Sequence, residues 1–274
     1  MAEPVRAALA RATAELAGRS DTARLDAELL MAHMLGIERE AMLLGRLDDP
    51  APEGFDALVA RRAAHEPVAY IVGHRDFWTI RLAVAPGVLI PRPDSETLIE
   101  AAVAHFSAVG PKRVLDLGVG SGALLLAVLA EWPGATGIGI DASPVAVDIA
   151  RKNAARLGFG HRAAIRAGDW GAGLDERFDL ILCNPPYVES GAALAPDVRE
   201  HEPASALFAG ADGLEDYRRL APQIGRLLVP GGLAVVEIGA DQADSVLGLF
   251  AAAGLAGSVR RDLGGRDRAV VIAP

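Results

Sequence analysis

The sequence predicts an α/β fold, in which a small helical domain precedes a mostly parallel, seven-stranded sheet that ends in an antiparallel hairpin. Three observations lead to this prediction. Alanine-rich periodic segments fill residues 3–64, strand-like and helical segments alternate after Pro93, and the last two extended segments are separated by only five residues. Because a helical crossover does not fit into so short a connection, these two segments must pair antiparallel.

The first part of the chain is expected to be helical up to about residue 64. Its periodic segments are separated by Gly18, by Gly36 and by two prolines near residue 50. Ser20 precedes the second periodic segment and is the expected N-cap of its helix. These segments are sufficient for a small helical domain.

The character of the sequence changes at Pro67. β-Branched and aromatic residues at 68–72 and 77–84 flank a polar, turn-like interruption, which predicts a short hairpin linker. Further along, the strands of the sheet are expected at 113–117, 135–140, 163–167, 178–183, 232–238, 257–262 and 268–273. The expected domains are therefore a helical domain at 1–75, a β-hairpin linker at 76–87 and an α/β domain at 88–274.

Composition and charge restrict the classes of protein that fit this chain. Hydrophobic residues make up 51% and charged residues 23% of the 274, which is ordinary for a globular protein and excludes a disordered or fibrous one. The net charge of −9 disfavours a protein that binds mainly to nucleic-acid phosphates. No apolar run approaches the roughly 18 residues of a membrane span, and the N-terminus does not resemble a signal peptide. We expect a cytoplasmic protein that contacts no membrane.

Residues that commonly bind metals are too scattered to form a site. The one cysteine, Cys183, lies in an apolar run and is expected to be buried, so no disulfide framework is possible. The six histidines contain no i, i+4 pair and no ligand-like cluster. We therefore expect no catalytic metal.

A glycine-rich turn follows the first strand of the α/β domain. The turn consists of Gly118, Val119, Gly120, Ser121 and Gly122. Its glycines let the backbone approach a ligand closely, and the N–H groups that begin the next helix point at polar or anionic atoms. A nucleotide-like ligand is indicated, although a plain tight turn or a dinucleotide fingerprint fits the same residues.

Acidic residues follow the next two strands. Asp141 ends the second strand, where its carboxylate can accept hydrogen bonds from both hydroxyls of a ribose. A helix N-cap is the alternative for Asp141, although Ser143 can cap that helix alone. Asp169 and Trp170 follow the third strand, where an acidic group and an aromatic face can flank an adenine ring. For Trp170 the alternative is a simple packing role.

The run Asn184-Pro185-Pro186-Tyr187 follows the fourth strand directly. The two prolines fix φ and remove two backbone donors, so the carbonyl groups at this strand end stay free to accept hydrogen bonds. The Asn184 side-chain oxygen and the Pro185 carbonyl can accept both protons of an NH₂ group, which orients its nitrogen for attack. Tyr187 supplies a flat wall for a planar amide or base.

A parallel sheet that ends in an antiparallel hairpin, combined with these motifs, is typical of class I S-adenosylmethionine-dependent methyltransferases. The chain as a whole resembles the HemK family, the bacterial protein-(glutamine-N5) methyltransferases that modify peptide chain release factors. The resemblance covers nearly the whole chain. It rests on the segments at 26–30, 66–71, 89–96, 169–170, 184–187, 197–203, 206–207, 213–214 and 230–232.

The resemblance implies a site for S-adenosyl-L-methionine, with S-adenosyl-L-homocysteine as the product. The residues that it assigns to the cofactor are Gly118, Val119, Gly120, Ser121, Gly122, Asp141, Trp170 and Asn184. It assigns the substrate glutamine to Asn184, Pro185, Pro186 and Tyr187, with Asn184 and Pro185 as the catalytic residues. The chain departs from the family at Val119, where a small hydroxyl residue is common, and at Ser95, which replaces a more usual threonine but keeps its hydroxyl.

The resemblance further implies methylation of the amide nitrogen (N5) of the glutamine in the Gly-Gly-Gln motif of release factors, which supports translation termination. The domain at 1–75 would dock the release factor, and we expect a monomer with no direct nucleic-acid contact. Two alternatives remain open. A nucleic-acid adenine or cytosine amino methyltransferase faces the same chemical problem, but the charge of −9 and the lack of a basic stripe argue against it. The other is a non-catalytic release-factor adaptor, against which the intact motifs argue.

Overall fold

The computed structural model describes residues 3–273, which fall into two compact units. One unit contains the chain up to His74 together with Leu194–Glu202, and the other contains Arg75–Ala193 together with the chain from Pro203 onward. The division falls inside a short strand, β1 (His74–Phe77). Within residues 3–273, no helix is both long enough and apolar enough to cross a membrane.

The first unit is helical, as the sequence predicts. Its helices are α1 (Val5–Leu16), α2 (Ala23–Leu35), α3 (Arg39–Gly45), α4 (Phe55–Ala63), α5 (Val68–Val72) and α9 (Pro196–His201). The apolar faces of α1, α2 and α4 form its core, which includes the fully buried Leu30, Met31 and Val59. The N-cap of α2 is Thr22 and not Ser20, because the Ser20 hydroxyl is bound to the backbone N–H of Thr22 (3.1 Å) in the preceding turn.

Residues 68–72 form the helix α5, so the prediction of an extended segment there was wrong. Pro67 precedes α5 and Gly73 ends it in the left-handed region, at φ 79°. Ala69, Tyr70 and Ile71 are buried along its length, and this burial outweighs the preference of β-branched residues for strands. The hairpin is formed only by β1 and β2 (Ile80–Ala83), and it begins slightly before the predicted linker.

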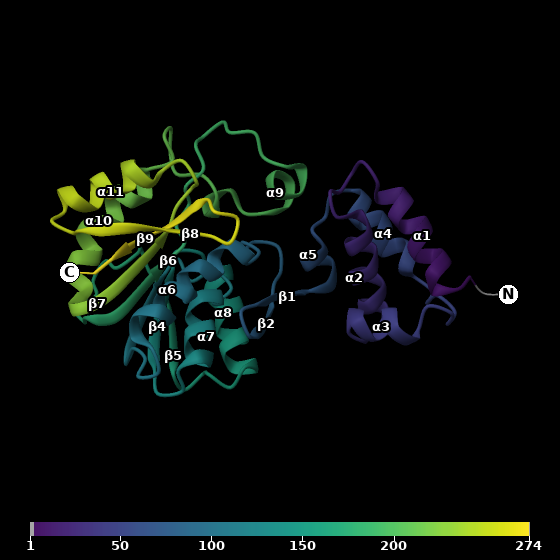
Figure 1. Cartoon of the computed structure of the whole chain (residues 1–274), viewed down its shortest axis with the longest axis horizontal. Helices are drawn as coiled ribbons and strands as arrows, with labels where there is room; N and C mark the ends of the chain where they lie inside the picture. Colours follow the sequence, from purple (N-terminus) through teal and green to yellow (C-terminus); the bar gives the residue numbers. More distant parts are fainter. Residues whose placement is uncertain (1–2, 274) are drawn as a thin grey trace. The chain divides into compact units, whose positions relative to one another are not determined.

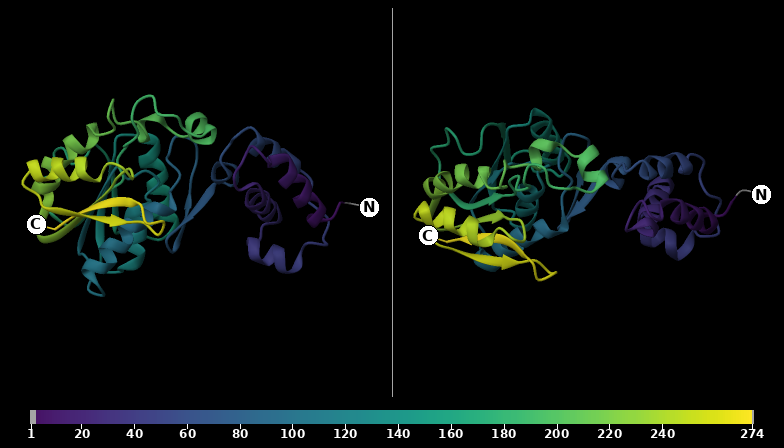
Figure 2. Two further views of the ribbon diagram at one scale, coloured as in Figure 1. Left: turned by 45° about the horizontal axis from the view of Figure 1, so that its top comes forward. Right: turned by 90° about the horizontal axis from the view of Figure 1, so that it is seen from above.

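The second unit contains the predicted seven-stranded sheet (Figure 1). Its strands are β3 (Arg113–Leu117), β4 (Thr136–Asp141), β5 (Ala163–Ala167), β6 (Phe178–Cys183), β7 (Leu228–Glu237), β8 (Gly257–Arg261) and β9 (Asp267–Ile272). The strand order is β5-β4-β3-β6-β7-β9-β8, and β9 pairs antiparallel with both β7 and β8. The fold prediction is confirmed, including the C-terminal hairpin, which is yellow in Figure 2 and forms one edge of the sheet.

Helices cover both faces of this sheet. They are α6 (Glu96–Phe106), α7 (Ala123–Glu131), α8 (Pro144–Arg156), α10 (Glu215–Leu227) and α11 (Ala243–Ala252), with short 3₁₀ turns η1 (Pro93–Ser95) and η2 (Ala204–Ala206). One hydrophobic cluster joins the sheet to α6, α7 and α8, and a second cluster joins it to α10 and α11 on the other face. Cys183 is buried in the second cluster, as its apolar neighbours predict.

The register of three neighbouring strands brings the sequence motifs together. In the parallel pairs, Leu117 lies opposite Cys183 on β6 and opposite Ile140 on β4. The residues that follow these strands therefore emerge side by side at the carboxyl edge of the sheet, where the chain turns away in opposite directions from β3. The glycine turn, Asp141 and Asn184 meet at this edge.

Candidate active site

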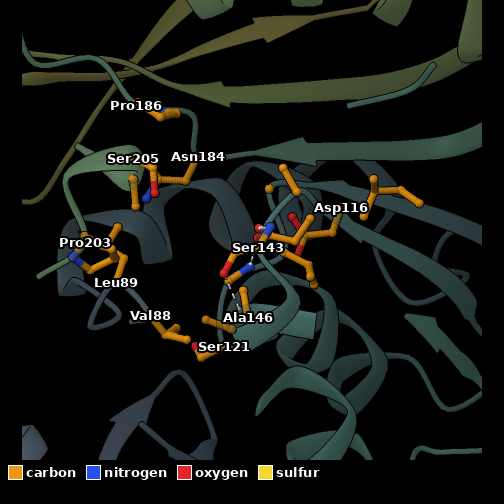
Figure 3. Close-up of a pocket in the computed structure, with 18 of the residues that line it drawn as sticks. Val88, Leu89, Asp116, Ser121, Ser143, Ala146, Asn184, Pro186, Pro203 and Ser205 are labelled. Atoms are coloured by element: carbon orange, nitrogen blue, oxygen red, sulfur yellow. Dashed lines mark hydrogen bonds between the residues drawn. The ribbon is translucent and has the colours of Figure 1, made fainter. Parts of the chain in front are cut away.

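A cavity of about 280 Å³ lies at the carboxyl ends of β3, β4 and β6. Among the residues predicted from the sequence, its lining includes Gly118, Val119, Gly120, Ser121, Asp141, Trp170, Asn184 and Pro186. Figure 3 shows Asn184, Pro203 and Ser205 on one side of this cavity and Asp116, Ser143 and Ala146 on the other. The predicted Gly122, Pro185 and Tyr187 are not part of the lining.

Hydrogen bonds from the turn to β4 fix the glycine turn. The N–H groups of Gly118 and Val119 both donate to the carbonyl of Ile140, each at 2.9 Å. The N–H of Gly120 donates to Oδ2 of Asp141 at 2.8 Å, so this carboxylate fastens the turn.

The carboxylate of Asp141 does not cap the next helix. Its Oδ1 accepts from the N–H of Ser143 at 2.9 Å. The N-cap of α8 is Ser143, whose hydroxyl accepts from the N–H of Ala146, and Figure 3 shows this bond as a dashed line. Each carboxylate oxygen of Asp141 accepts one backbone hydrogen bond and keeps a lone pair for a further donor. Asp141 is therefore a structural anchor of the turn as well as a cavity residue.

Three residues of the turn are fixed by packing. A Cβ on Gly118 would lie 3.2 Å from Cζ3 of Trp170, so the indole ring packs closely against the turn. Gly122 has a φ of 89°, and a Cβ there would lie 2.8 Å from Cδ1 of Leu126, so its lack of a side chain serves the start of α7. Val119 is buried in the core, and a Cβ on Gly139 would lie 2.6 Å from its Cγ2. Val119, where the chain departs from the family pattern, therefore packs against Gly139 of β4.

Asp169 and Trp170 both line the cavity. The carboxylate of Asp169 is bound by Arg219 at 2.5 and 2.6 Å. The indole of Trp170 lies beside Asp216, a further cavity residue. Burial raises the pKa of this carboxyl group, against the lowering effects of the Arg219 guanidinium and of a hydrogen bond from Trp170. Of the two, the aromatic face is thus the more available to a planar ring.

Asp116 is a cavity residue that the sequence pattern did not reveal. It lies on β3 with 1% of its surface exposed, and its Oδ2 accepts from the N–H of Leu125 at 3.0 Å. Its Oδ1 has no hydrogen-bond partner within residues 3–273, and burial raises the pKa of its carboxyl group to about 8. In the sequence, Asp116 stands inside a buried-strand run. Only the parallel register shows that it lies at the cavity.

The pKa of Asp116 predicts a pH dependence of stability. Because the folded protein holds this proton up to about pH 8, whereas the unfolded chain releases it near pH 3.8, folding stability is lost as pH rises between these values. The variant Asp116→Asn carries no such proton. Its stability relative to the unchanged protein should therefore rise from pH 4 to pH 8, measured by denaturant unfolding of the ligand-free proteins. Parallel pH curves for the two proteins would show that Asp116 does not titrate in this way.

The side chain of Asn184 is oriented by a hydrogen bond to Ser95. The amide Nδ2 of Asn184 donates to the hydroxyl of Ser95 at 3.2 Å, and Ser95, the last residue of η1, is itself buried. With Nδ2 engaged, the amide oxygen Oδ1 is the group left to accept hydrogen bonds. Ser95 appears in the sequence only as a departure from a family pattern, and its contact with Asn184 spans 89 positions of the chain.

Pro185 and Tyr187 are not among the residues that line the cavity. Pro185 is buried, and the ring of Tyr187 packs against the second hydrophobic cluster. The Tyr187 hydroxyl donates to Oε1 of Glu237 at 3.4 Å. The backbone carbonyl of Tyr187 accepts from Nε2 of Gln242 at 3.0 Å. Together with the bond between Asn184 and Ser95, these contacts anchor the run after β6 at both ends. Among the described residues, no group of three His, Cys, Asp or Glu side chains is placed to hold a metal ion.

Two family models match the chain. Residues 7–73 match the PrmC N-terminal domain, and residues 94–202 match the methyltransferase small domain. The chain is also similar to solved methyltransferase structures. One is a methyltransferase from Pyrococcus furiosus, with a TM-score of 0.52 and 16% identity over 70% of this chain and 87% of that one. Another is the T. thermophilus 16S rRNA N2 G1207 methyltransferase in complex with AdoMet and guanosine, with a TM-score of 0.54 and 21% identity over 73% of this chain and 49% of that one. At these identities, the likeness supports the fold alone.

Curated relatives match nearly the whole chain at much higher identity. The release factor glutamine methyltransferase of Cereibacter sphaeroides is 48% identical over 98% of this chain and 96% of its own length. Those of Rhodospirillum rubrum and Caulobacter vibrioides are 47% and 46% identical, over 90% and 92% of this chain and 78% and 89% of their own lengths. The chain therefore belongs to the family of release factor glutamine methyltransferases.

Proposed function

We propose that this protein transfers the methyl group of S-adenosyl-L-methionine to the side-chain amide nitrogen of the glutamine in the Gly-Gly-Gln motif of peptide chain release factors. The observation that carries this proposal is the meeting of two motifs in one cavity: Asn184, a group suited to a carboxamide, lines the same space as the glycine turn and Asp141. Relatives at 46% to 48% identity are named release factor glutamine methyltransferases, which supports this proposal.

The cavity offers acceptors and an aromatic face that suit S-adenosyl-L-methionine. The unpartnered Oδ1 of Asp116 is a buried acceptor suited to an ammonium group, and an ammonium there would favour the ionised carboxylate. Asp141 is placed to accept from ribose hydroxyls, and the indole of Trp170 offers a face to a planar base. When bound, this cofactor supplies a methyl group on a positively charged sulfur, which is already a reactive donor.

The substrate nitrogen is the difficult partner, because the lone pair of a carboxamide is delocalised into its carbonyl. The Oδ1 of Asn184 and the carbonyl of Pro185 accept its two protons and hold the nitrogen toward the cavity. Such orientation contributes several kcal/mol, up to roughly 7 to 11 in favourable intramolecular models. The same two acceptors stabilise the positive charge that develops on the nitrogen. Positioning therefore supplies most of the catalysis.

The release factor is the proposed protein partner, and the helical domain is proposed to dock it. Residues 7–73, which match the PrmC N-terminal domain, form a unit with its own core, separate from the cofactor cavity. A modifier of translation factors works in the cytoplasm, and we propose that it acts as a monomer. The net charge of −9 supports a protein substrate over a nucleic acid.

Methylation of whole substrates tests the proposal against its alternatives. The protein is incubated with S-adenosyl-L-methionine and, in separate reactions, a release factor, the same release factor with Gly-Gly-Gln changed to Gly-Gly-Ala, and adenine- or cytosine-containing oligonucleotides. We expect a gain of one methyl group in the first reaction alone, detected by intact mass. Methylated oligonucleotides would favour a nucleic-acid enzyme, and release-factor binding without methylation would favour an adaptor.

Replacement of Asp141 should weaken cofactor binding. Asp141→Ala is expected to cost about 1 to 3 kcal/mol of binding free energy, because hydrogen bonds to a charged acceptor are lost. Calorimetric titration with S-adenosyl-L-methionine measures this loss. The matched control is Asp148→Ala, an exposed aspartate of α8 paired with Lys152, which should leave the affinity unchanged. Equal affinities in the two folded variants would show that Asp141 does not bind the ribose.

A further inference from the structure

A buried amide side chain links the glycine turn to the hairpin. Asn153, on α8, has none of its surface exposed. Its Nδ2 donates to the carbonyls of Ser121 and Ala83, each at 2.9 Å, and its Oδ1 accepts from the N–H of Ala83 at 2.8 Å. Ser121 belongs to the glycine turn and lines the cavity, whereas Ala83 ends β2 of the hairpin. The cofactor and substrate contacts proposed above do not involve Asn153.

The backbone of Ala83 leaves the Asn153 amide only one orientation. Ala83 presents both a donor and an acceptor, so the amide oxygen must face its N–H and the amide nitrogen must face its carbonyl. The second proton of Nδ2 is then directed to the carbonyl of Ser121. A flipped amide would place an NH₂ group against the N–H of Ala83 and an oxygen against two carbonyl oxygens. The hairpin therefore decides which group of Asn153 reaches the turn.

The bond from Asn153 holds the turn at a point that β4 does not reach. The anchors from β4 act on the first three N–H groups of the turn. The peptide group between Ser121 and Gly122 is held at its N–H by the carbonyl of Val119 (2.7 Å) and at its carbonyl by Asn153. Glycines at 120 and 122 flank Ser121, and a glycine resists rotation of the backbone less than any other residue. Without Asn153, this peptide group is held on one side only.

The hairpin is firmly attached to the helices of the second unit and can therefore support Asn153. The N–H of Trp78, in the connection between β1 and β2, donates to Oε1 of Glu96 on α6 at 2.8 Å. The indole Nε1 of Trp78 donates to Oε2 of Glu131 on α7 at 3.1 Å, and Arg156 of α8 donates to the carbonyl of Arg81 on β2. Contacts to three helices thus fix the backbone that orients Asn153.

We infer that Asn153 is a positioning residue, which holds the glycine turn in the conformation that receives S-adenosyl-L-methionine and uses the hairpin backbone as its support. This inference rests on the cofactor part of the proposed function. Asn153 is not among the residues that line the cavity, so it acts through the Ser121 peptide group. A turn that is already fixed loses less conformational freedom when the cofactor binds, and this raises the affinity.

The variant Asn153→Asp tests the role of the amide NH₂ group. Aspartate keeps the volume and an oxygen for the N–H of Ala83, and Nη2 of Arg156, 3.3 Å from Oδ1, favours its ionised form. An ionised carboxylate has no proton for the two carbonyls, so the Ser121 peptide group loses its partner. Affinity for S-adenosyl-L-methionine, measured by calorimetry, should fall about tenfold or more. With saturating cofactor, single-turnover methylation of a release factor should stay within about threefold, because Asn184 is held by other contacts.

The matched control is Glu131→Ala. It removes an anchor of the hairpin at Trp78 but no contact to the turn, so cofactor affinity should stay within about twofold of that of the unchanged protein. Denaturant unfolding of both ligand-free variants supplies the stability for comparison. A merely structural role of Asn153 would lower the free energy of unfolding and leave the affinity of the folded protein as it was.

Amide hydrogen exchange, followed by nuclear magnetic resonance, tests the link without the loaded enzyme's activity. Binding of S-adenosyl-L-methionine to the unchanged protein should slow exchange at the N–H of Gly120 in the turn and at the N–H of Ala83, because Asn153 joins the two segments. The N–H of Trp78, which is bonded to Glu96 in the same hairpin, should exchange equally with and without cofactor. In ligand-free Asn153→Asp, exchange at Gly120 should be faster than in the unchanged protein.

The outcomes distinguish this inference from the proposed function. Equal cofactor affinities for the unchanged protein and folded Asn153→Asp, or slower exchange at Gly120 without slower exchange at Ala83, would show that the positioning role is wrong while the function stands. If the unchanged protein binds the cofactor but methylates no release factor, the function is wrong, and the affinities still decide the inference. If it binds no cofactor, both fall together. Should Asn153→Asp not fold, exchange at Ala83 and Trp78 in the unchanged protein decides.

Discussion

Replacement of Asn184 by alanine is expected to lower the rate of methyl transfer by about 10² to 10³-fold, by analogy with the loss of one preorganised contact to a transition state. The reason is geometric. The Oδ1 of Asn184 is the acceptor that the Ser95 contact leaves free, and it lines the cavity beside the glycine turn. Its removal leaves the substrate nitrogen unoriented, and this loss affects the transition state more than the binding of either substrate.

The measurement is single-turnover methylation of a release factor, with cofactor affinity titrated separately. Asn184→Asp keeps an acceptor but loses the donor to Ser95 and adds a negative charge, so we expect slower transfer with cofactor affinity kept or increased. Tyr187→Phe loses only the hydroxyl bond to Glu237 and should be milder than either. An Asn184→Ala protein within about threefold of the unchanged one, or about 0.7 kcal/mol, would be incompatible with an orienting role.

Loss of a buried ion pair should destabilise the helical unit. Asp26 and Arg62 are both buried, and Nε of Arg62 donates to Oδ2 of Asp26 at 2.6 Å. The hydroxyls of Ser20 and Thr22 bind the same carboxylate, and Arg62 also lies 3.7 Å from Asp197. Arg62→Ala leaves the buried carboxylate without its counter-charge, so we expect a loss of about 3 to 5 kcal/mol in the free energy of unfolding of this unit.

Denaturant unfolding monitored in the helical unit measures this loss. The control is the neighbouring Arg61→Ala, which removes an exposed pair with Glu66 and should cost less than about 1 kcal/mol. If the helical unit docks the release factor, Arg62→Ala should also slow methylation of the whole release factor while cofactor affinity stays unchanged. Equal stabilities for the two arginine variants would show that the buried pair is not what holds this unit together.

The fold could be predicted from the sequence where local patterns and topology agree. The alternation of strands and helices after Pro93 and the five-residue connection before β9 leave few arrangements for the sheet. The prediction was wrong at 68–72, where β-branched residues form a helix. Propensity failed there because Pro67 and Gly73 set the ends of a helix and its middle residues are buried.

The candidate site was predictable only in its contiguous motifs. The glycine turn, Asp141 and Asn184 each follow a strand, so parallel pairing brings them together once the strand order is known. Ser95 and Glu237 reach Asn184 and Tyr187 from other parts of the chain, and no local pattern marks them. Gly122 and Tyr187 belong to conspicuous motifs but do not line the cavity, because membership of a motif does not decide which of its residues face a cavity.

The position of the transferred methyl group tests the central claim most directly. A release factor treated with the unchanged protein and isotope-labelled S-adenosyl-L-methionine is digested, and the modified peptide is fragmented in a mass spectrometer. The account predicts one labelled methyl group, located on the side-chain amide nitrogen of the glutamine in Gly-Gly-Gln and absent from the product of Asn184→Ala on the same timescale. A label on any other residue, or on an oxygen or the backbone, would contradict a cavity built to hold a primary amide nitrogen for methylation.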